Sequence, residues 1–266
     1  MEEELEIENL ILPDNHSTIS CENLDEAIEQ YKQLGYRLDM ICPADAPREA
    51  LLSKGDETIR LVSNAQRTTN NGQWITGRAG MEYRDLIPGR LGGKVIASHI
   101  RLTQGGEVPD YVHYHKIDFQ MIYCKKGRIK VVYEDQGPSF WLETGDCVLQ
   151  PPEIRHRVLE CTAGAEVIEV SMPAEHETWV EHEIALPTIV VNPDRDFGGQ
   201  RFVCHTAENV VDDIRDTGIA NATGDLVEVL VLREAGVDTK LLLTFSSLFA
   251  ESNGALSAPI AIEIAV

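Results

Sequence analysis

The 266-residue sequence predicts a mainly β fold, in which one barrel is flanked by a small α/β module and by a second, shorter β unit. Three observations lead to this prediction. Short alternating segments separated by glycine-containing turns fill the middle of the chain. An apolar stripe at helical spacing lies within positions 1–65, and the last part of the chain repeats part of the middle at an offset of 131.

The α/β module is predicted over residues 1–65. A helix should begin near Asn23 and run to Leu34, because its apolar residues fall on one face and Gly35 follows in the usual C-terminal position. Strands are expected at 17–20, 36–42 and 58–62. This order resembles one βαβββ module of the vicinal-oxygen-chelate superfamily, which includes glyoxalases and extradiol dioxygenases. The resemblance implies modules that work in pairs, and the segment supplies one.

Residues 65–77 are polar and lack a period, so they are predicted to be a linker. The barrel is expected over 78–186, as an all-β barrel or jelly roll. Its short strands are separated by turn signals such as Gly92-Gly93 and Gly145-Asp146. The predicted strands are 94–102, 111–115, 119–124, 128–134, 147–150, 156–160 and 165–171.

Residues 187–266 contain the repeat, in which Gly93 and Gly105 match Gly224 and Gly236. The segment predicts an incomplete second unit, because the chain ends before a counterpart of the later strands. Chance similarity between two β-rich stretches is the alternative. An incomplete barrel leaves an open sheet edge, which another part of the chain or a second copy must cover. A homo-oligomer is therefore expected.

Four residues of the first unit predict a metal site. His113 and His115 are two apart, so both imidazoles leave the same face of a strand. Gln120 offers an amide oxygen further along the chain, and His156 follows a Gly-Asp turn and a Pro-Pro corner. Neutral imidazoles from separate hairpins are suited to a divalent transition metal. In the repeat, Thr244, Ser246 and Glu251 stand in place of the first three, which predicts that the second unit holds no metal.

The spacing resembles the two cupin motifs, G-x5-H-x-H-x3-4-E-x6-G and G-x5-P-x-G-x2-H. Gly127 follows Gln120 and Pro151 follows Gly145 at the matching distances. The sequence departs from the pattern at three points: Gln120 replaces a glutamate, Glu153 replaces a glycine, and the loop before His113 is one residue longer. The resemblance covers residues 78–175.

The resemblance implies a small-molecule ligand and one divalent metal (Zn, Fe, Mn or Ni) held by His113, His115, His156 and Gln120. The ligand spacing is similar to that of quercetinase-type and acireductone-type dioxygenases. Because Gln120 cannot ionise, the site lacks the base that a glutamate gives, which favours Lewis-acid isomerase, cyclase or lyase chemistry over dioxygenase chemistry. Two alternatives stay open: Gln120 as a hydrogen-bonding neighbour of a three-histidine site, and a cupin that binds or only assembles without turnover.

Composition excludes some partners. The chain has 44 acidic and 23 basic residues and a formal net charge of −21, a field that repels nucleic acid. The amino terminus, Met-Glu-Glu-Glu, lacks the basic and apolar regions of a secretory signal, and no apolar stretch approaches the roughly 18 residues of a membrane span. Six scattered cysteines favour free thiols in a reducing compartment. A cytoplasmic protein without nucleic-acid or membrane partners is expected.

Overall fold

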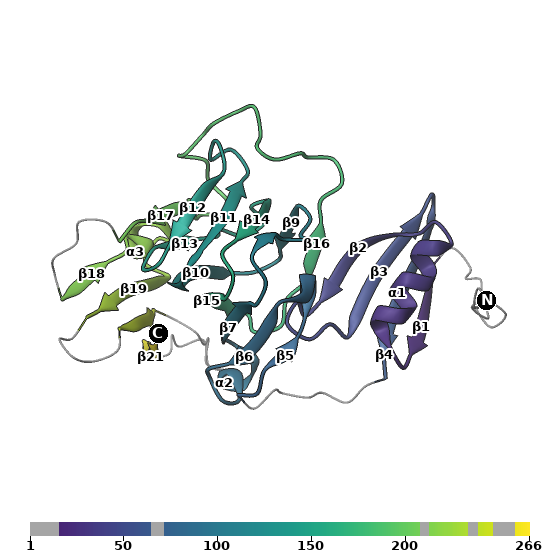
Figure 1. The fold of residues 1–266 in the computed structure, drawn as a ribbon, viewed down its shortest axis with the longest axis horizontal. Helices are drawn as coiled ribbons and strands as arrows, with labels where there is room; N and C mark the ends of the chain where they lie inside the picture. The colour runs from purple at the N-terminus through teal and green to yellow at the C-terminus, as the bar shows by residue number, and fades with distance from the viewer. Residues whose placement is uncertain (1–15, 65–71, 208–212, 234–238, 247–258) are drawn as a thin grey trace, which may run out of the picture.

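The computed structural model describes residues 16–64, 72–207, 213–233, 239–246 and 259–266. The predicted mainly β architecture is confirmed (Figure 1): an α/β module lies at one end, a jelly-roll barrel in the middle and a small sheet at the other end. None of the helices in these ranges is long and apolar enough to cross a membrane.

The α/β module has the order strand, helix and three strands, of which the sequence predicted all but the middle strand of the last three. Its elements are β1 (His16–Cys21), α1 (Leu24–Gln33), β2 (Arg37–Cys42), β3 (Glu49–Lys54) and β4 (Glu57–Ser63). The side chain of Asn23 caps α1 by accepting a hydrogen bond from the Glu26 amide. The apolar face of α1 packs on the sheet through Leu24, Ile28 and Tyr31. The likeness to the vicinal-oxygen-chelate module stays a prediction.

Strand β3 corrects the sequence analysis, which expected only a polar segment between β2 and β4. Ala50 and Leu52 point into the module's core while their neighbours are half-exposed, so β3 has a two-residue period that is too short to stand out. The sheet order is β1-β4-β3-β2, with β1 parallel to β4 and the other pairs antiparallel.

The module's sheet does not end at β2. Strand β16 (Thr178–Val180) pairs with β2 on one side and with β9 (His113–His115) on the other, so one ten-stranded sheet runs from the module through the barrel. The remaining strands of this sheet are β8 (Gly106–Glu107), β11 (Arg128–Tyr133), β12 (Phe140–Glu143) and β14 (His156–Cys161). The predicted boundary between module and barrel is therefore crossed by backbone hydrogen bonds.

The second sheet of the barrel has seven strands in the order β17-β13-β10-β15-β7-β6-β5. The bounds are β5 (Ile75–Thr76), β6 (Glu82–Asp85), β7 (Ile96–Leu102), β10 (Phe119–Lys126), β13 (Cys147–Leu149), β15 (Ala165–Met172) and β17 (Val203–His205). A 3-10 turn, Arg78–Gly80, precedes β6, and the short helix α2 (Arg90–Gly93) joins β6 to β7. The inward faces of the two sheets enclose an apolar core that includes Ile100, Ile122, Val131, Leu142, Val148 and Val167.

The C-terminal unit is a four-stranded antiparallel sheet in the order β18-β19-β20-β21. Its elements are β18 (Ile214–Asp216), α3 (Ile219–Ala222), β19 (Val227–Leu232), β20 (Lys240–Phe245) and β21 (Ile260–Ala265). The unit packs against the outward face of the seven-stranded sheet. There the rings of Phe119 and Phe245 pack edge to face, with their centroids 6.0 Å apart. Upstream, β17 pairs with β13 and so covers the edge of the barrel sheet.

The repeat is visible in one part of this unit. The order β6-α2-β7 recurs as β18-α3-β19, and the first residues of β7 and β19, Ile96 and Val227, are related by the offset of the sequence repeat. After β19 the chain forms a meander, because β20 pairs directly with β19 and β21 pairs with β20. In the barrel, by contrast, β15 lies between β7 and β10. Glu251 lies outside the described residues.

Candidate metal centre

Three histidines meet inside the barrel. Strands β9 and β14 pair so that His113 lies opposite His156, and His115 lies on the same face as His113. One nitrogen from each ring can be chosen such that all three atoms lie within 4.8 Å of one another. The three side chains are buried, with exposed fractions of 1% to 5%. This is the group that the sequence predicted from the motif spacing.

The hydrogen bonds of the three rings fix their orientation. Nδ1 of His113 lies 2.8 Å from the Tyr111 carbonyl, and Nδ1 of His156 lies 2.9 Å from the Ile154 carbonyl. A carbonyl can only accept, so both Nδ1 atoms carry the proton and the lone pair is on Nε2. At His115 the hydroxyl of Thr178 lies 2.9 Å from Nδ1, and because a hydroxyl can accept, this contact is compatible with the same tautomer. Metal-binding histidines are usually held by such a hydrogen bond from the other ring nitrogen.

Gln120 also points into the barrel. It alternates on β10 with Phe119 and Met121, which face the C-terminal sheet. Its side chain is 1% exposed, and neither its amide oxygen nor its amide nitrogen has a hydrogen-bond partner among the described residues. A buried amide without partners is costly, by about 1–3 kcal/mol for each unsatisfied group. A cation beside Oε1 would remove part of that cost, so the residue fits a metal site.

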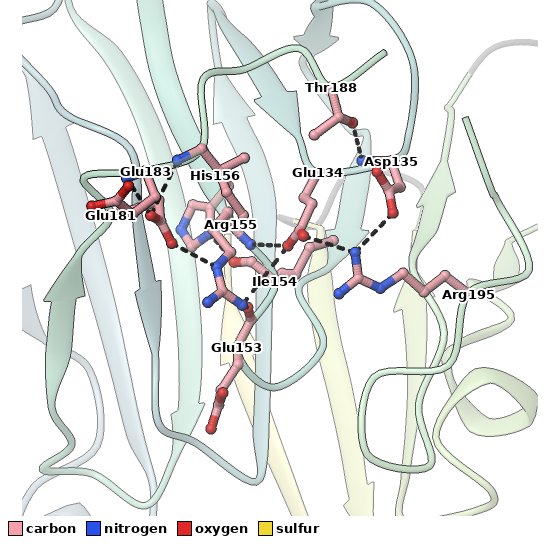
Figure 2. A network of polar contacts seen from close by, with 11 residues as sticks. Glu134, Asp135, Glu153, Ile154, Arg155, His156, Glu181, Glu183, Thr188 and Arg195 are labelled. Atoms are coloured by element: carbon pink, nitrogen blue, oxygen red, sulfur yellow. Dashed lines mark hydrogen bonds and ion pairs between the residues drawn. The ribbon is translucent and has the colours of Figure 1, made fainter. Parts of the chain in front are cut away.

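The turn that aims His156 is held by ion pairs (Figure 2). Arg155 lies 3.0 Å from Glu181 and its amide donates to Glu134, while Arg195 holds Glu134 at 2.7 Å. Glu153 has a φ of +60°, the left-handed conformation that favours glycine. This is the position where the cupin motif has its glycine, and the Glu153 amide donates to the carbonyl of His115.

Two residues outside the motifs also contact the centre. Thr178 is fully buried on β16, the strand that joins the barrel to the α/β module. His176 lies with its ring edge-on to His115, the centroids 5.2 Å apart, and its buried Nε2 has no hydrogen-bond partner in the described part of the chain. Burial lowers the pKa of His176 and keeps the ring neutral. Both come much later in the sequence than His115, so no local spacing connects them with it.

A cavity adjoins the three histidines. Its volume is about 50 Å3. Apolar side chains form most of the lining, including Met81, Tyr83, Ile100, Leu102, Ile122 and Val167. The polar lining residues besides the histidines are Tyr133, Gln150, Arg157 and Glu169. Gln150 donates to the Tyr133 hydroxyl at 3.0 Å, and the Tyr133 ring stacks on His156 with centroids 5.7 Å apart.

Residues 98–171 match the family model described as "Cupin domain". This match supports a cupin domain in the barrel, as the sequence motifs predicted. No curated protein matches the sequence. The strands that carry His113, His115, Gln120 and His156 all lie within the matched cupin segment.

Solved structures with a similar barrel include an RmlC-like cupin from Shewanella frigidimarina, which is 24% identical, covers 42% of this chain and 93% of that one, and gives a TM-score of 0.32. KdgF from a Halomonas species is 17% identical over 41% of this chain and 94% of its own, with a TM-score of 0.32. A deletion mutant of Bacillus subtilis oxalate decarboxylase is 15% identical over 70% of this chain, with a TM-score of 0.38. The match spans 59% of the decarboxylase chain.

Proposed function

We propose that this cupin binds one divalent transition metal per chain through Nε2 of His113, His115 and His156, with Gln120 as a weaker fourth donor. Two observations support it most: the Nδ1 atoms of His113 and His156 donate to carbonyls, which leaves their lone pairs on Nε2, and one nitrogen of each of the three rings lies within 4.8 Å of the others. Zn, Fe, Mn and Ni all accept imidazole ligands, so the donor set alone does not select among them.

We further propose that the protein is an enzyme that acts on a small organic molecule by Lewis-acid chemistry. Three neutral imidazoles and an amide leave the charge of a bound dication uncompensated, which makes it a strong polariser of a carbonyl oxygen. Four protein donors also leave one or two positions on a five- or six-coordinate metal for the substrate. The small, largely apolar cavity admits a compact ligand.

Metal content measures the first part of this proposal. Tag-free wild-type protein should hold one equivalent of metal by elemental analysis. His115→Ala should lose stoichiometric metal, because it removes one of three mutually close donors. Gln120→Ala should weaken binding without abolishing it, since an amide oxygen is the poorest donor of the set.

The matched control is His99→Ala. His99 is as buried as the three histidines but lies on the outward face of β7, so its loss should leave metal content unchanged. Full metal occupancy in a His113/His115/His156 triple-alanine variant would contradict the proposed site.

A further inference from the structure

The inward face of β15 places a carboxylate in the metal cavity. On this strand Ala165 and Val167 face the barrel core, whereas Ile168 and Val170 face the C-terminal sheet. Glu169 has the inward parity and lines the same cavity as the three histidines. It is half-buried, and the Ser171 hydroxyl donates to it at 3.4 Å.

Glu169 is the one carboxylate among the described side chains that line this cavity. It lines the cavity of the three histidines but is not in their group of mutually close donors. On the neighbouring strand, Ile122 pairs with Glu169 and Gln120 pairs with Ser171. An inward-facing carboxylate therefore lies on the strand next to Gln120, two residues from the residue that pairs with it.

A buried phenol lines the same cavity as Glu169. Tyr133 is fully buried there, and Gln150 donates a hydrogen bond to its phenol oxygen at 3.0 Å. Because Gln150 donates, the phenol hydrogen is left to point elsewhere. The cavity thus holds a hydroxyl group as well as a carboxylate.

We propose that Glu169 is the catalytic base of this cavity and that its substrates are small carbonyl compounds with an acidic C–H beside the carbonyl, such as 2-oxo acids. This rests on the proposed function, in which a bound dication polarises the carbonyl. In the step, the C–H bond breaks and its proton passes to the Glu169 carboxylate. The electron pair forms a C–C double bond and the carbonyl oxygen takes the negative charge. Return of the proton completes an exchange or an isomerisation, with no oxidant or reductant.

Two features of the site favour this class. A 2-oxo acid offers two oxygens in chelating positions, and a six-coordinate metal held by four protein donors would leave two positions for them. The cavity is small, which suits a compact ligand. Pyruvate is a suitable probe, because loss of its methyl protons to D2O reports proton removal directly.

The experiment follows pyruvate methyl exchange by proton NMR with zinc-loaded protein. Wild type should accelerate the exchange, and Glu169→Gln should lower the rate by about 100-fold or more, the usual range for loss of a general base. Glu166→Gln is the matched control, since Glu166 lies on the same strand but points outward to His99 at 2.7 Å. It should exchange pyruvate at the wild-type rate.

A binding measurement separates a chemical role from structural damage. Oxalate has the same chelating oxygens but no C–H, and calorimetric titration should show that Glu169→Gln binds it at least as tightly as wild type, because a negative charge is gone. Metal content should stay at one equivalent. Loss of both oxalate binding and exchange in Glu169→Gln would show that Glu169 is structural and overturn the inference.

Two other outcomes overturn it as well: metal-loaded wild type that does not exchange pyruvate, and Glu169→Gln that exchanges it at the wild-type rate. In both, metal is bound and the proposed metal site survives. If elemental analysis instead finds no metal in the wild-type protein, the proposed function is contradicted, and this inference fails with it.

Discussion

The histidines on the inward and outward faces of the barrel differ in which ring nitrogen holds the proton. On the outward face, Arg84 lies 2.9 Å from Nδ1 of His99. A guanidinium can only donate, so Nδ1 of His99 accepts and its Nε2–H donates to Glu166 at 2.7 Å. On the inward face the order is reversed, with Nδ1 of His113 and His156 donating to carbonyls.

Burial does not distinguish the two kinds of histidine. His99 is 4% exposed, within the range of the three inward rings. Both nitrogens of His99 are used by protein partners, and Trp74 packs against the ring at 4.9 Å. The inward rings instead use only Nδ1 for a carbonyl or hydroxyl, and one nitrogen of each ring lies within 4.8 Å of the others. The tautomer, set by the nearest acceptor or donor, separates a structural histidine from a candidate ligand.

The largest expected effect comes from the outward face. Phe245→Ala removes a fully buried ring that packs edge to face on Phe119, and should lower the free energy of unfolding by about 3–5 kcal/mol. Urea unfolding of metal-free protein measures it, with the fully exposed Ile189→Ala as a control expected to change stability by less than about 0.5 kcal/mol. Metal content of the folded variant should stay at one equivalent. Loss of metal would mean that the two faces of the sheet are coupled.

A smaller effect is expected at the hydrogen bond behind His115. Thr178→Val keeps the shape of the side chain but removes the acceptor of Nδ1–H, which should weaken metal binding by about 10–100-fold. This equals about 1.4–2.8 kcal/mol. Competition with a chelator of known affinity measures the change, and Thr178→Ser should restore most of it. Equal affinity in Thr178→Val would show that β16 does not orient the ring.

The sequence predicted the parts of the centre that depend on short spacing. His113 and His115 share a face because a strand has a period of two, and the second motif placed His156 after the Gly145 turn. Thr178 could not be predicted, because it reaches His115 through a strand pairing 63 residues away in sequence. Glu169 was missed because its inward parity follows from the packing of β15 between β7 and β10.

The fold shows the same division. The module's helix and seven of the barrel strands followed from local periodicity, whereas others, such as β6 and β12, were not predicted. The continuous sheet through β16 was not predicted either, since three residues carry no pattern of their own. The repeat predicted the position of β19. It did not predict the meander after β19, because that depends on the direct pairing of β20 with β19. Which strands pair with each other depends on tertiary packing, and the local pattern of one sequence does not reveal it.

The smallest expected effect concerns the pH dependence contributed by His99. Burial, only partly offset by the hydrogen bond to Glu166, lowers the pKa of His99 from its ordinary value of 6.5 in the folded protein. The unfolded chain therefore takes up this proton at a higher pH than the folded one. The stability that His99 contributes is fully present above pH 6.5 and is lost as the pH falls toward the lowered pKa.

His99→Gln should remove this dependence. The difference in free energy of unfolding between wild type and His99→Gln should shrink by less than about 1 kcal/mol as the pH falls from about 7.5 to 5.5, since one group contributes at most about 1.36 kcal/mol per pH unit. Urea unfolding of metal-free protein at several pH values measures it, and the metal centre plays no part. A difference that grows as the pH falls would mean that the folded protein prefers charged His99 paired with Glu166. The ring of His99 would then be held by an ion pair with Glu166 rather than by the neutral tautomer that Arg84 imposes. The outward and inward histidines would then differ in charge and not only in tautomer.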